Sequence, residues 1–453
     1  MNISSELRQV VRGRVLVAGD EGFDTARLPW NRAVEQPVLA VVEAEDADDV
    51  AAVVRAAGLA GLSVSTQPSG HGASGNTDGT ILLRTGRLRG VEVRPGERLA
   101  RVGAGVSWGE VLSEAGGHGL TGLAGSSPAT GVVGYTLGGG VSWFARKYGY
   151  AANSVRAFDV VTADGTRARV DAGSDPELFW ALRGGGGDFA VVTAMEFDLH
   201  PAPQLYGGRI VWPADRAADV MAAFRETARE APEELTVWFS LMQFPPLPEV
   251  PQPLRGLSAV LVDVAHLGEA GEAQALLRRF EKIDGRVLDT RGPLPVAALG
   301  DICAEPTDPG PGSILAQLLT RFDDRAAATV LAEAAGSGSV APLALVQVRH
   351  LGGALARPVP GAGACGHVEE EYLLSLLGVP FTPESAAAVG ERQREISSAL
   401  VPCTSGRKPF TNLGPGERAA GAFPGDVLAR LRDLKRRRDP LGVLRSNYPV
   451  LDD

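Results

Sequence analysis

The chain is poor in cysteine, in basic charge and in long apolar runs. Its three cysteines, Cys303, Cys365 and Cys403, stand far apart without a CxxC pair, which excludes a structural zinc cluster or a disulfide framework and is typical of a reducing cytoplasm. Lysine and arginine number 44 against 54 acidic residues, a net charge of −10, so the basic footprint of a nucleic-acid-binding protein is missing. No run of eighteen apolar residues and no signal-peptide core is present, so we expect a cytoplasmic protein that does not span a membrane.

Glycine, by contrast, is abundant and unevenly distributed. About half of the 57 glycines lie between Gly61 and His200. Glycine permits positive φ angles and lets the backbone approach a ligand closely. We interpret this segment as a cofactor cradle, although a loop-rich segment would show the same bias.

Periodicity predicts a mixed α+β architecture. Acidic residues at 46–49 precede apolar residues at helical spacing, which predicts a helix that ends near Gly58 and Gly61. Asp164-Gly165 between two alternating segments predicts a β-hairpin. Beyond Pro201, proline-rich joints separate segments such as a predicted helix at 269–280 and a predicted strand at 343–349.

Three loops of small residues, at 67–75, 126–140 and 183–189, fall within about 120 residues. Successive backbone N–H groups in such loops can bind an anion such as a diphosphate. Three of them could enclose one extended cofactor, but their spacing does not identify it. The GxGxxG sequence at 361–366 follows prolines rather than a strand, so we interpret it as a loop. The basic run at 435–438 is interpreted as the solvated end of a helix.

Several sequence words, in order, resemble a known flavoprotein family. The region from about Ala33 to Pro203 resembles the flavin-binding domain of the vanillyl-alcohol oxidase superfamily, and in particular its berberine bridge enzyme-like group. Bacterial members with a single histidine link to the flavin, such as the hydroxynicotine oxidases, are the most similar. The words that carry this resemblance are Ser69-Gly70-His71, residues 132–140, Lys147-Tyr148-Gly149, residues 161–165, residues 178–189 and residues 191–193.

The resemblance implies a bound FAD and assigns residues to it. His71 occupies the position whose imidazole bonds covalently to the flavin, with Ser69 in the same word, and Val192 would bind the adenine through its backbone. Asn412 and Asn447 lie in C-terminal words that return to the flavin. Backbone groups around the pyrophosphate and along the cofactor would come from Gly70, Gly72, Ser74, Gly75, Gly131, Gly134, Gly138, Gly139 and Gly140.

The sequence also departs from the family pattern. Ser127 stands where doubly linked relatives carry a cysteine, so the resemblance implies a single covalent link. Phe410 replaces a tyrosine that acts as a base in several relatives, and a phenyl ring cannot accept a proton. We therefore expect a base elsewhere, with His350 as the first candidate and Tyr372 as the second; a hydrogen bond within its own strand is the alternative role for His350.

The resemblance divides the chain into three parts. It implies an α+β fold with a two-part PCMH-type FAD-binding domain at 1–203, whose core is 33–203, and a smaller α+β substrate domain with an antiparallel sheet at 204–408. Residues 409–453 are then a C-terminal segment that returns to the FAD domain.

Two classes of function follow from this reading. The first is an oxidase that takes a hydride from an alcohol, an amine or a polycyclic natural product and passes the electrons to O2, with no metal required. The second is a flavin-bearing protein that binds or sequesters an organic ligand. A dehydrogenase that excludes O2 is a variant of the first class.

Overall fold

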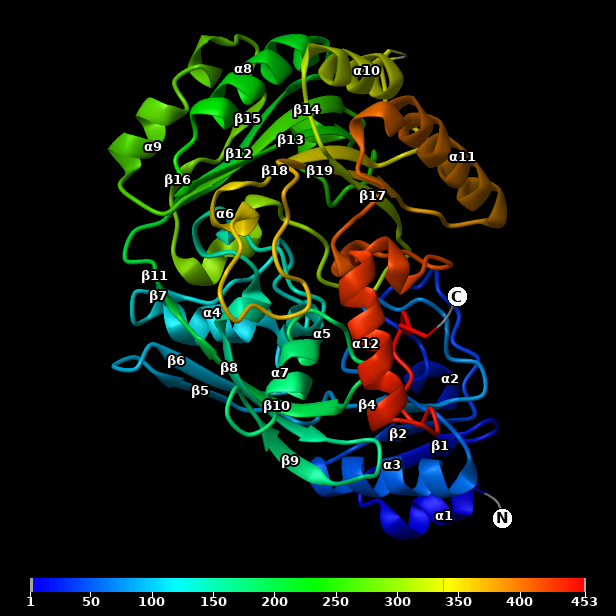
Figure 1. The fold of residues 1–453 in the computed structure, drawn as a ribbon. Coiled ribbons are helices and arrows are strands. Elements are labelled where there is room, and N and C mark those ends of the chain that lie inside the picture. The colour runs from blue at the N-terminus through cyan, green and yellow to red at the C-terminus, as the bar shows by residue number, and fades with distance from the viewer. Residues whose placement is uncertain (1–2, 337, 452–453) are drawn as a thin grey trace.

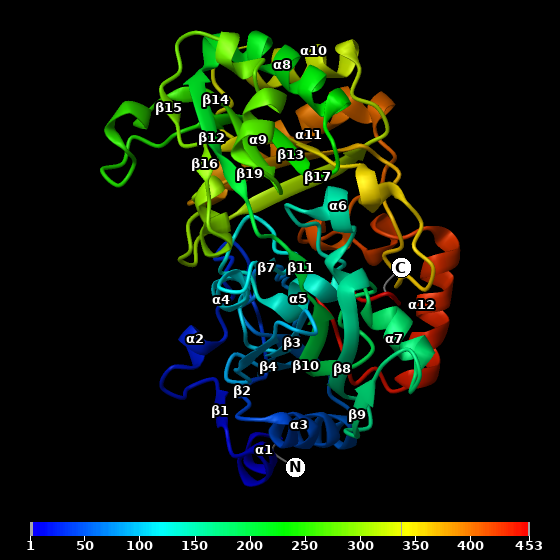
Figure 2. The same ribbon diagram turned by 90° about the vertical axis from the view of Figure 1, so that its left-hand side faces the viewer.

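The structure is a computed structural model that describes residues 3–336 and 338–451. Figure 1 shows two stacked parts: the N-terminal segments and the C-terminal helix build the lower one, and the middle of the chain builds the upper one. In Figure 2 the upper sheet has one face toward the lower part and helices on the other. The change from lower to upper part falls between β11 (His200–Pro201) and β12 (Tyr206–Pro213).

The first sheet of the lower part is mixed, in the order β1-β2-β4-β3, with β2, β4 and β3 parallel and β1 antiparallel to β2. Helix α3 (Ala47–Ala60) packs on this sheet. It begins where the Asp46 side chain accepts hydrogen bonds from the first backbone N–H groups, and it ends at Gly61, which has φ +66°. The other elements are α1 (Ile3–Val10), β1 (Arg14–Val17), α2 (Phe23–Ala26), β2 (Ala40–Glu43), β3 (Val64–Gln67) and β4 (Ile81–Arg84).

The second sheet of the lower part is antiparallel, in the order β5-β6-β10-β8-β9, and a separate two-stranded sheet pairs β7 with β11. Its elements are β5 (Val91–Arg94), β6 (Leu99–Gly103), α4 (Trp108–Gly116), β7 (Leu120–Thr121), α5 (Val132–Leu137), α6 (Ala145–Tyr148), β8 (Val155–Val161), β9 (Arg167–Val170), α7 (Pro176–Leu182) and β10 (Val191–Asp198). The helix α12 (Gly425–Arg438) lies beside α7 (Figure 1).

The upper part is built on one antiparallel sheet in the order β15-β12-β14-β13-β18-β19-β17, with β16 also paired to β12. Its elements are α8 (Ala217–Glu230), β13 (Leu235–Gln243), β14 (Ser258–His266), α9 (Ala270–Leu276), β15 (Leu288–Asp289), β16 (Gly292–Pro293), β17 (Ser313–Leu319), α10 (Asp324–Ala335), β18 (Leu345–His350), β19 (Tyr372–Gly378) and α11 (Pro383–Leu400).

The two faces of this sheet differ because strand residues alternate between them. On β13, Val237 and Phe239 belong to the apolar core under the outer helices. The alternate residues face the lower part: the Thr236 hydroxyl donates to the Trp143 carbonyl at 2.6 Å, and the Trp238 ring stacks on Trp143 with centroids 3.6 Å apart. We call this inner face of the sheet, which is turned toward the lower part, the roof.

The structure confirms the predicted α+β class with an antiparallel sheet in the second domain. The predicted helix over residues 46–57 and the hairpin at Asp164-Gly165 are also present, and residues 361–366 form a loop. The helix predicted at 269–280 is shorter, because α9 ends at Leu276 and a 3₁₀ turn follows. Within the described residues, no helix is long and apolar enough to cross a membrane, and no cluster of His, Cys, Asp and Glu forms a metal site.

The basic run of α12 is not uniformly solvated, which corrects our interpretation of it. Lys435 is buried, and its ammonium donates to the Asp439 carboxylate at 2.8 Å and to the carbonyls of Asp188 and Leu444. The remaining residues of the run are exposed. Lys435 therefore anchors the C-terminal segment to the lower part.

Candidate functional site

The three small-residue loops meet in the lower part, together with the C-terminal segment. A Cβ on Gly131 would lie 3.3 Å from Pro68, and the Gly186 N–H donates to the Leu137 carbonyl at 2.9 Å, so the second loop contacts both the first and the third. The Ser74 hydroxyl donates to the Asn447 carbonyl at 2.6 Å, which joins the C-terminal segment to the first loop. The prediction from the sequence that the three loops lie together is therefore confirmed.

His71 lies in the loop that follows β3 and is held on two sides. Its ring stacks on Trp30 with centroids 4.3 Å apart, and Nδ1 lies 2.9 Å from the Ser69 hydroxyl. Nε2 is buried and has no hydrogen-bond partner among the described residues. Desolvation lowers the pKa of His71 to about 4, so the imidazole is neutral at pH 7 and Nε2 can carry a free lone pair.

Glycines leave space where a cofactor would need it. Gly131, Gly134 and Gly138 follow one another at spacings of three and four residues, which places them on one face of α5. A Cβ on Gly134 would meet nothing within 4 Å, and the same is true of Gly72 in the first loop. Gly75 has φ +82°, a conformation that other residues rarely adopt. These positions form a cradle along the loops that side chains would fill.

Buried polar atoms without partners surround this cradle. Besides His71 Nε2, the hydroxyls of Ser127, Thr136 and Ser446 are buried and unbonded within the described residues. Buried polar groups in proteins are nearly always hydrogen-bonded, so such a set indicates a polar ligand. The glycine cradle and these orphaned atoms fit an extended polar cofactor such as FAD.

Hydrogen bonds made by two side chains of the lower part, Gln67 and Asp188, hold the C-terminal segment against the cradle. The Gln67 amide donates to the Asn447 side chain at 3.2 Å and to Gln36 at 2.6 Å, so Gln67 is part of a polar network. The Asp188 carboxylate accepts hydrogen bonds from the backbone N–H groups of Ser446 and Val450 at 3.0 and 2.6 Å. Gln67 and Asp188 therefore hold the C-terminal segment that carries Asn447.

Asn412 and Val192 occupy different environments. Asn412 is half-buried in a 3₁₀ turn whose neighbour Thr411 would contact a Cβ on Gly138 at 2.7 Å, so it lies near the end of α5. The Val192 side chain is buried in the core of the lower part, at a β-bulge of β10. Its proposed contact with adenine would use only the backbone and stays a prediction.

Phe410 packs among aromatic and glycine residues. Its ring centroid lies 5.5 Å from that of Phe423 and 5.8 Å from that of Tyr448, and a Cβ on Gly186 would touch it. The Tyr448 hydroxyl donates to the Leu413 carbonyl at 2.5 Å. Neither ring therefore offers a free proton acceptor.

The structure argues against His350 and Tyr372 as bases. Both residues alternate along their strands with residues of the inner face, so their side chains point away from the lower part. Tyr372 belongs to the apolar core under the outer helices, and its ring centroid lies 5.5 Å from that of His350. His350 Nε2 lies 2.9 Å from a guanidinium nitrogen of Arg146, and burial together with this cation lowers the His350 pKa to about 3. With so low a pKa, the neutral imidazole of His350 is a weak proton acceptor near neutral pH. The hypothesis is therefore corrected: His350 binds an arginine that links the two parts.

Sequence reasoning missed the polar side chains of the roof. Trp238 and Arg349 are cross-strand partners there, and Gln347 and Ser240 are partners one step along the same strands. The signal was present in β18, where Gln347 and Arg349 alternate with Val346 and Val348. Such alternation indicates one polar and one apolar face.

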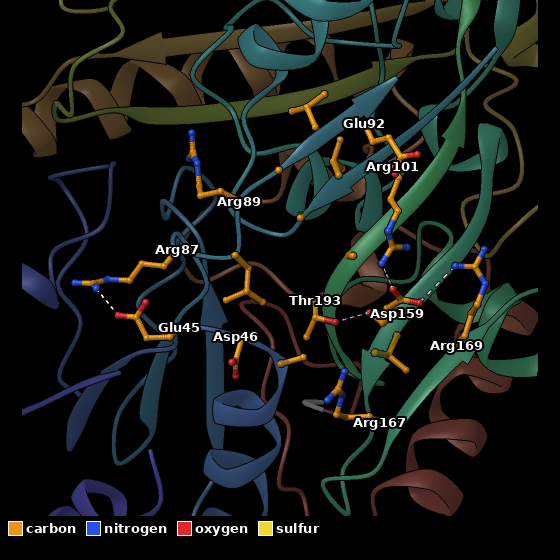
Figure 3. Close-up of a pocket in the computed structure, with 18 of the residues that line it drawn as sticks. Glu45, Asp46, Arg87, Arg89, Glu92, Arg101, Asp159, Arg167, Arg169 and Thr193 are labelled. Atoms are coloured by element: carbon orange, nitrogen blue, oxygen red, sulfur yellow. Dashed lines mark hydrogen bonds and ion pairs between the residues drawn. The ribbon is translucent and has the colours of Figure 1, made fainter. Parts of the chain in front are cut away.

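A hollow of about 710 Å³ lies on the surface of the lower part beside β6, β8 and β10 (Figure 3). Arginines line it, and each has an acidic partner. Asp159 pairs with both Arg101 and Arg169, as Figure 3 shows. The other pairs are Arg87 with Glu45, Arg89 with Glu110, and Arg167 with Asp48. Because every arginine of this hollow is already paired with an acidic side chain, we assign no ligand to it.

Comparisons with known proteins agree with the geometry. The profile of a family described as FAD binding domain matches residues 38–171. The chain is 28% identical to (R)-6-hydroxynicotine oxidase of Paenarthrobacter nicotinovorans, over 97% of each chain. Its structure is similar to that of 6-hydroxy-D-nicotine oxidase from Arthrobacter nicotinovorans, with a TM-score of 0.83 and 25% identity over 97% of this chain and 98% of that one. The fold also matches BBE-like 1 of Physcomitrella patens, with a TM-score of 0.85 and 19% identity over the whole of both chains.

Proposed function

Because the chain belongs to the berberine bridge enzyme-like family of FAD-dependent oxidoreductases, we propose that it is an oxidase with a single covalent link to FAD at His71. Bound FAD would supply the redox chemistry, accepting a hydride from a substrate C–H bond and passing two electrons to O2 to give H2O2. The protein then has to hold the cofactor, orient the substrate and exclude water.

The environment of His71 carries this proposal. A nitrogen that attacks a carbon must present a lone pair, and the neutral imidazole presents one at Nε2. Trp30 on one face and Ser69 at Nδ1 fix the ring, so the reactive nitrogen is held in place before a cofactor arrives. Ser127 is a hydroxyl rather than a thiol, which supports one link rather than two.

The remaining cofactor contacts follow from the cradle. We assign the first loop to the pyrophosphate and the face of α5 to the other side of the cofactor, because these are the positions with open space or positive φ. Asn412 and Asn447 approach from the C-terminal segment. The residues assigned through backbone groups are Gly70, Gly72, Ser74, Gly75, Gly131, Gly134, Gly138, Gly139, Gly140 and Val192.

The substrate would lie under the roof formed by the sheet of the upper part. The stacked pair of Trp143 and Trp238 closes the deep end of this space and is almost fully buried, which excludes water there. Ile314, at the opposite end of the roof, is 41% exposed, so the open side lies there. An organic molecule with a substantial apolar surface is the substrate that this space favours.

The experiment is an anaerobic screen of alcohols, amines and polycyclic compounds that follows loss of the flavin absorbance, with air admitted afterwards. Bleaching by a compound, followed by return of the colour and one equivalent of H2O2, is the expected result. Bleaching without reoxidation by air would indicate a dehydrogenase. Tight binding of compounds without any bleaching would instead indicate a ligand-binding protein and contradict the proposal.

A further inference from the structure

The roof carries one cation that has no acidic partner. Cross-strand pairing places a row of residues at the deep end of the roof, from Arg209 through Asp263 and Trp238 to Arg349. Arg209 and the fully buried Asp263 form an ion pair with N–O distances of 2.6 and 3.2 Å. Arg349 forms no ion pair with any residue that the structure describes.

Neutral groups hold Arg349 in place. Its guanidinium carbon lies 4.1 Å from the centre of the Trp238 ring, and its Nε donates to the Gln347 side chain at 2.5 Å. Gln347 is fixed in turn, because its amide donates to the Ser240 hydroxyl at 3.1 Å. The stack and this bond occupy one face and one edge of the guanidinium, so its terminal N–H groups remain free to bind an anion.

The lower part directs a second donor toward the same region. Tyr135, on α5, has a buried hydroxyl without a partner among the described residues, and the charge of Arg349 acts on that hydroxyl. Burial raises the pKa of Tyr135, so the group is a neutral O–H donor at working pH. We assign the Tyr135 hydroxyl as a second donor to an oxyanion bound at Arg349.

Among the described residues of the roof, the one carboxylate is that of Asp263, and its ion pair with Arg209 occupies it. The next row along the strands is polar but neutral, with Ser240, Gln347 and Ser375 as its polar members. The row after that is apolar, and consists of Met242, Leu345, Leu377 and Ile314. A ligand matched to this sequence of rows has an anionic group at the deep end and an apolar body toward the open side.

We propose that Arg349 is the substrate-binding cation of this protein, and that its substrate is an ionised oxygen acid, either a carboxylate or an acidic phenol or enol, on a flat apolar body. The inference rests on the proposed function, which places the substrate under the roof. For a phenol or enol conjugated with the reacting carbon, it also explains how the site works with Phe410 in place of a tyrosine: a substrate bound as this oxyanion needs no base to remove its O–H proton.

The test is isothermal calorimetry on the flavin-loaded protein with charged and neutral probes of matched shape. Naphthalene-2-carboxylate is compared with naphthalene-2-carboxamide, and pentafluorophenolate with pentafluoroaniline, so that the two arms separate a carboxylate from a phenolate site. A charge-assisted contact predicts at least tenfold tighter binding of one anion than of its neutral match, with a shift of the flavin absorbance on binding.

Three variants locate the effect. Arg349→Gln should abolish the preference for the anion, Arg349→Lys should keep part of it, and Tyr135→Phe should reduce it. Arg357→Gln, which removes an exposed arginine paired with Glu233, is the matched control and should keep it. Equal binding of charged and neutral probes in both arms, or a preference that survives in a folded Arg349→Gln protein, would overturn the inference. So would an Arg349→Gln protein whose flavin potential changes while its anion preference stays.

Flavin content, measured on every sample, separates this inference from the proposed function. Protein that contains no flavin contradicts both proposals. Protein that contains flavin and shows no preference for an anion contradicts only the role of Arg349.

Discussion

The Ser69 hydroxyl lies 2.9 Å from Nδ1 of His71, while Nε2 of the same ring is buried without a partner among the described residues. A neutral imidazole carries one proton, and we assign it to Nδ1, where the serine oxygen can accept it, because Nε2 has no acceptor among the described residues. The lone pair then lies on Nε2. The geometry therefore predicts attachment of the flavin through Nε2.

Ser69→Ala should slow covalent incorporation of FAD, because the ring loses the group that selects its tautomer. The protein is expressed without riboflavin, FAD is added, and the covalently bound fraction is followed with time after acid precipitation. Ser63→Ala, which removes a hydroxyl bonded to the Gly442 carbonyl outside the assigned cofactor contacts, is the comparison. Equal rates of attachment for Ser69→Ala and wild type would show that Ser69 does not control the tautomer.

Gly134→Leu should remove the flavin and leave the fold intact. The side chain would project into the open space along α5, and leucine forms helices better than glycine by about 0.8 kcal/mol, so stability should not fall. Gly271→Leu is the matched control, since Gly271 is also a helical glycine with open space around it, but on α9. We expect flavin loss only in Gly134→Leu, measured by the absorbance ratio of flavin to protein. Full flavin content in that variant would place the cofactor elsewhere.

The acid side of the stability curve should depend on His350. Its pKa is about 3 in the folded protein and about 6.5 in an unfolded chain. Between these values the unfolded chain binds a proton that the folded chain does not, so stability falls as the pH falls from 6.5 toward 3 and is unaffected above 6.5. His350→Gln should reduce this slope by up to about 1.4 kcal/mol per pH unit.

Urea unfolding at pH 6.5, 5.5 and 4.5 measures that slope. His118→Gln, at an exposed position, serves as the comparison. Parallel curves for wild type and His350→Gln would mean that His350 is not buried as a neutral group.

Lys435→Met should destabilise the protein by about 3–5 kcal/mol, because it leaves the buried Asp439 carboxylate without its counter-ion. Arg436→Met, at the next and exposed position, should change stability by no more than about 0.5 kcal/mol. The free energy of unfolding in urea checks both values. Similar values for the two variants would contradict the anchoring role of Lys435.

Local structure and the cradle could be predicted from the sequence because short-range chemistry determines them. Asp46 caps the N-terminus of α3 with its side chain, and Gly61 ends the helix in a left-handed conformation, as these residue types commonly do in proteins. The spacing of the glycines in α5 places them on one face of that helix. The short motifs shared with the family then predicted that the loops around His71 lie together.

The residues that line the roof could not be predicted in this way. Their identity depends on which face of each strand is turned toward the lower part. Arg349 and His350 are adjacent in β18 and must point to opposite sides of the sheet. Nothing local determines which of them faces the lower part. That choice is made by Trp238 and Thr236 of the neighbouring strand, which pack on Trp143 far away in the sequence. The burial of Lys435 has the same long-range origin.

The mass of the intact, acid-denatured protein shows directly whether the flavin is bonded to the chain. Wild-type protein should carry the added mass of one FAD less the two hydrogens lost when the bond forms, and the modified peptide should contain His71, linked through Nε2, with Ser127 unmodified. His71→Ala should show the mass of the bare chain. A wild-type protein with the mass of the bare chain and a colourless precipitate, or a flavin attached at any other residue, would contradict it.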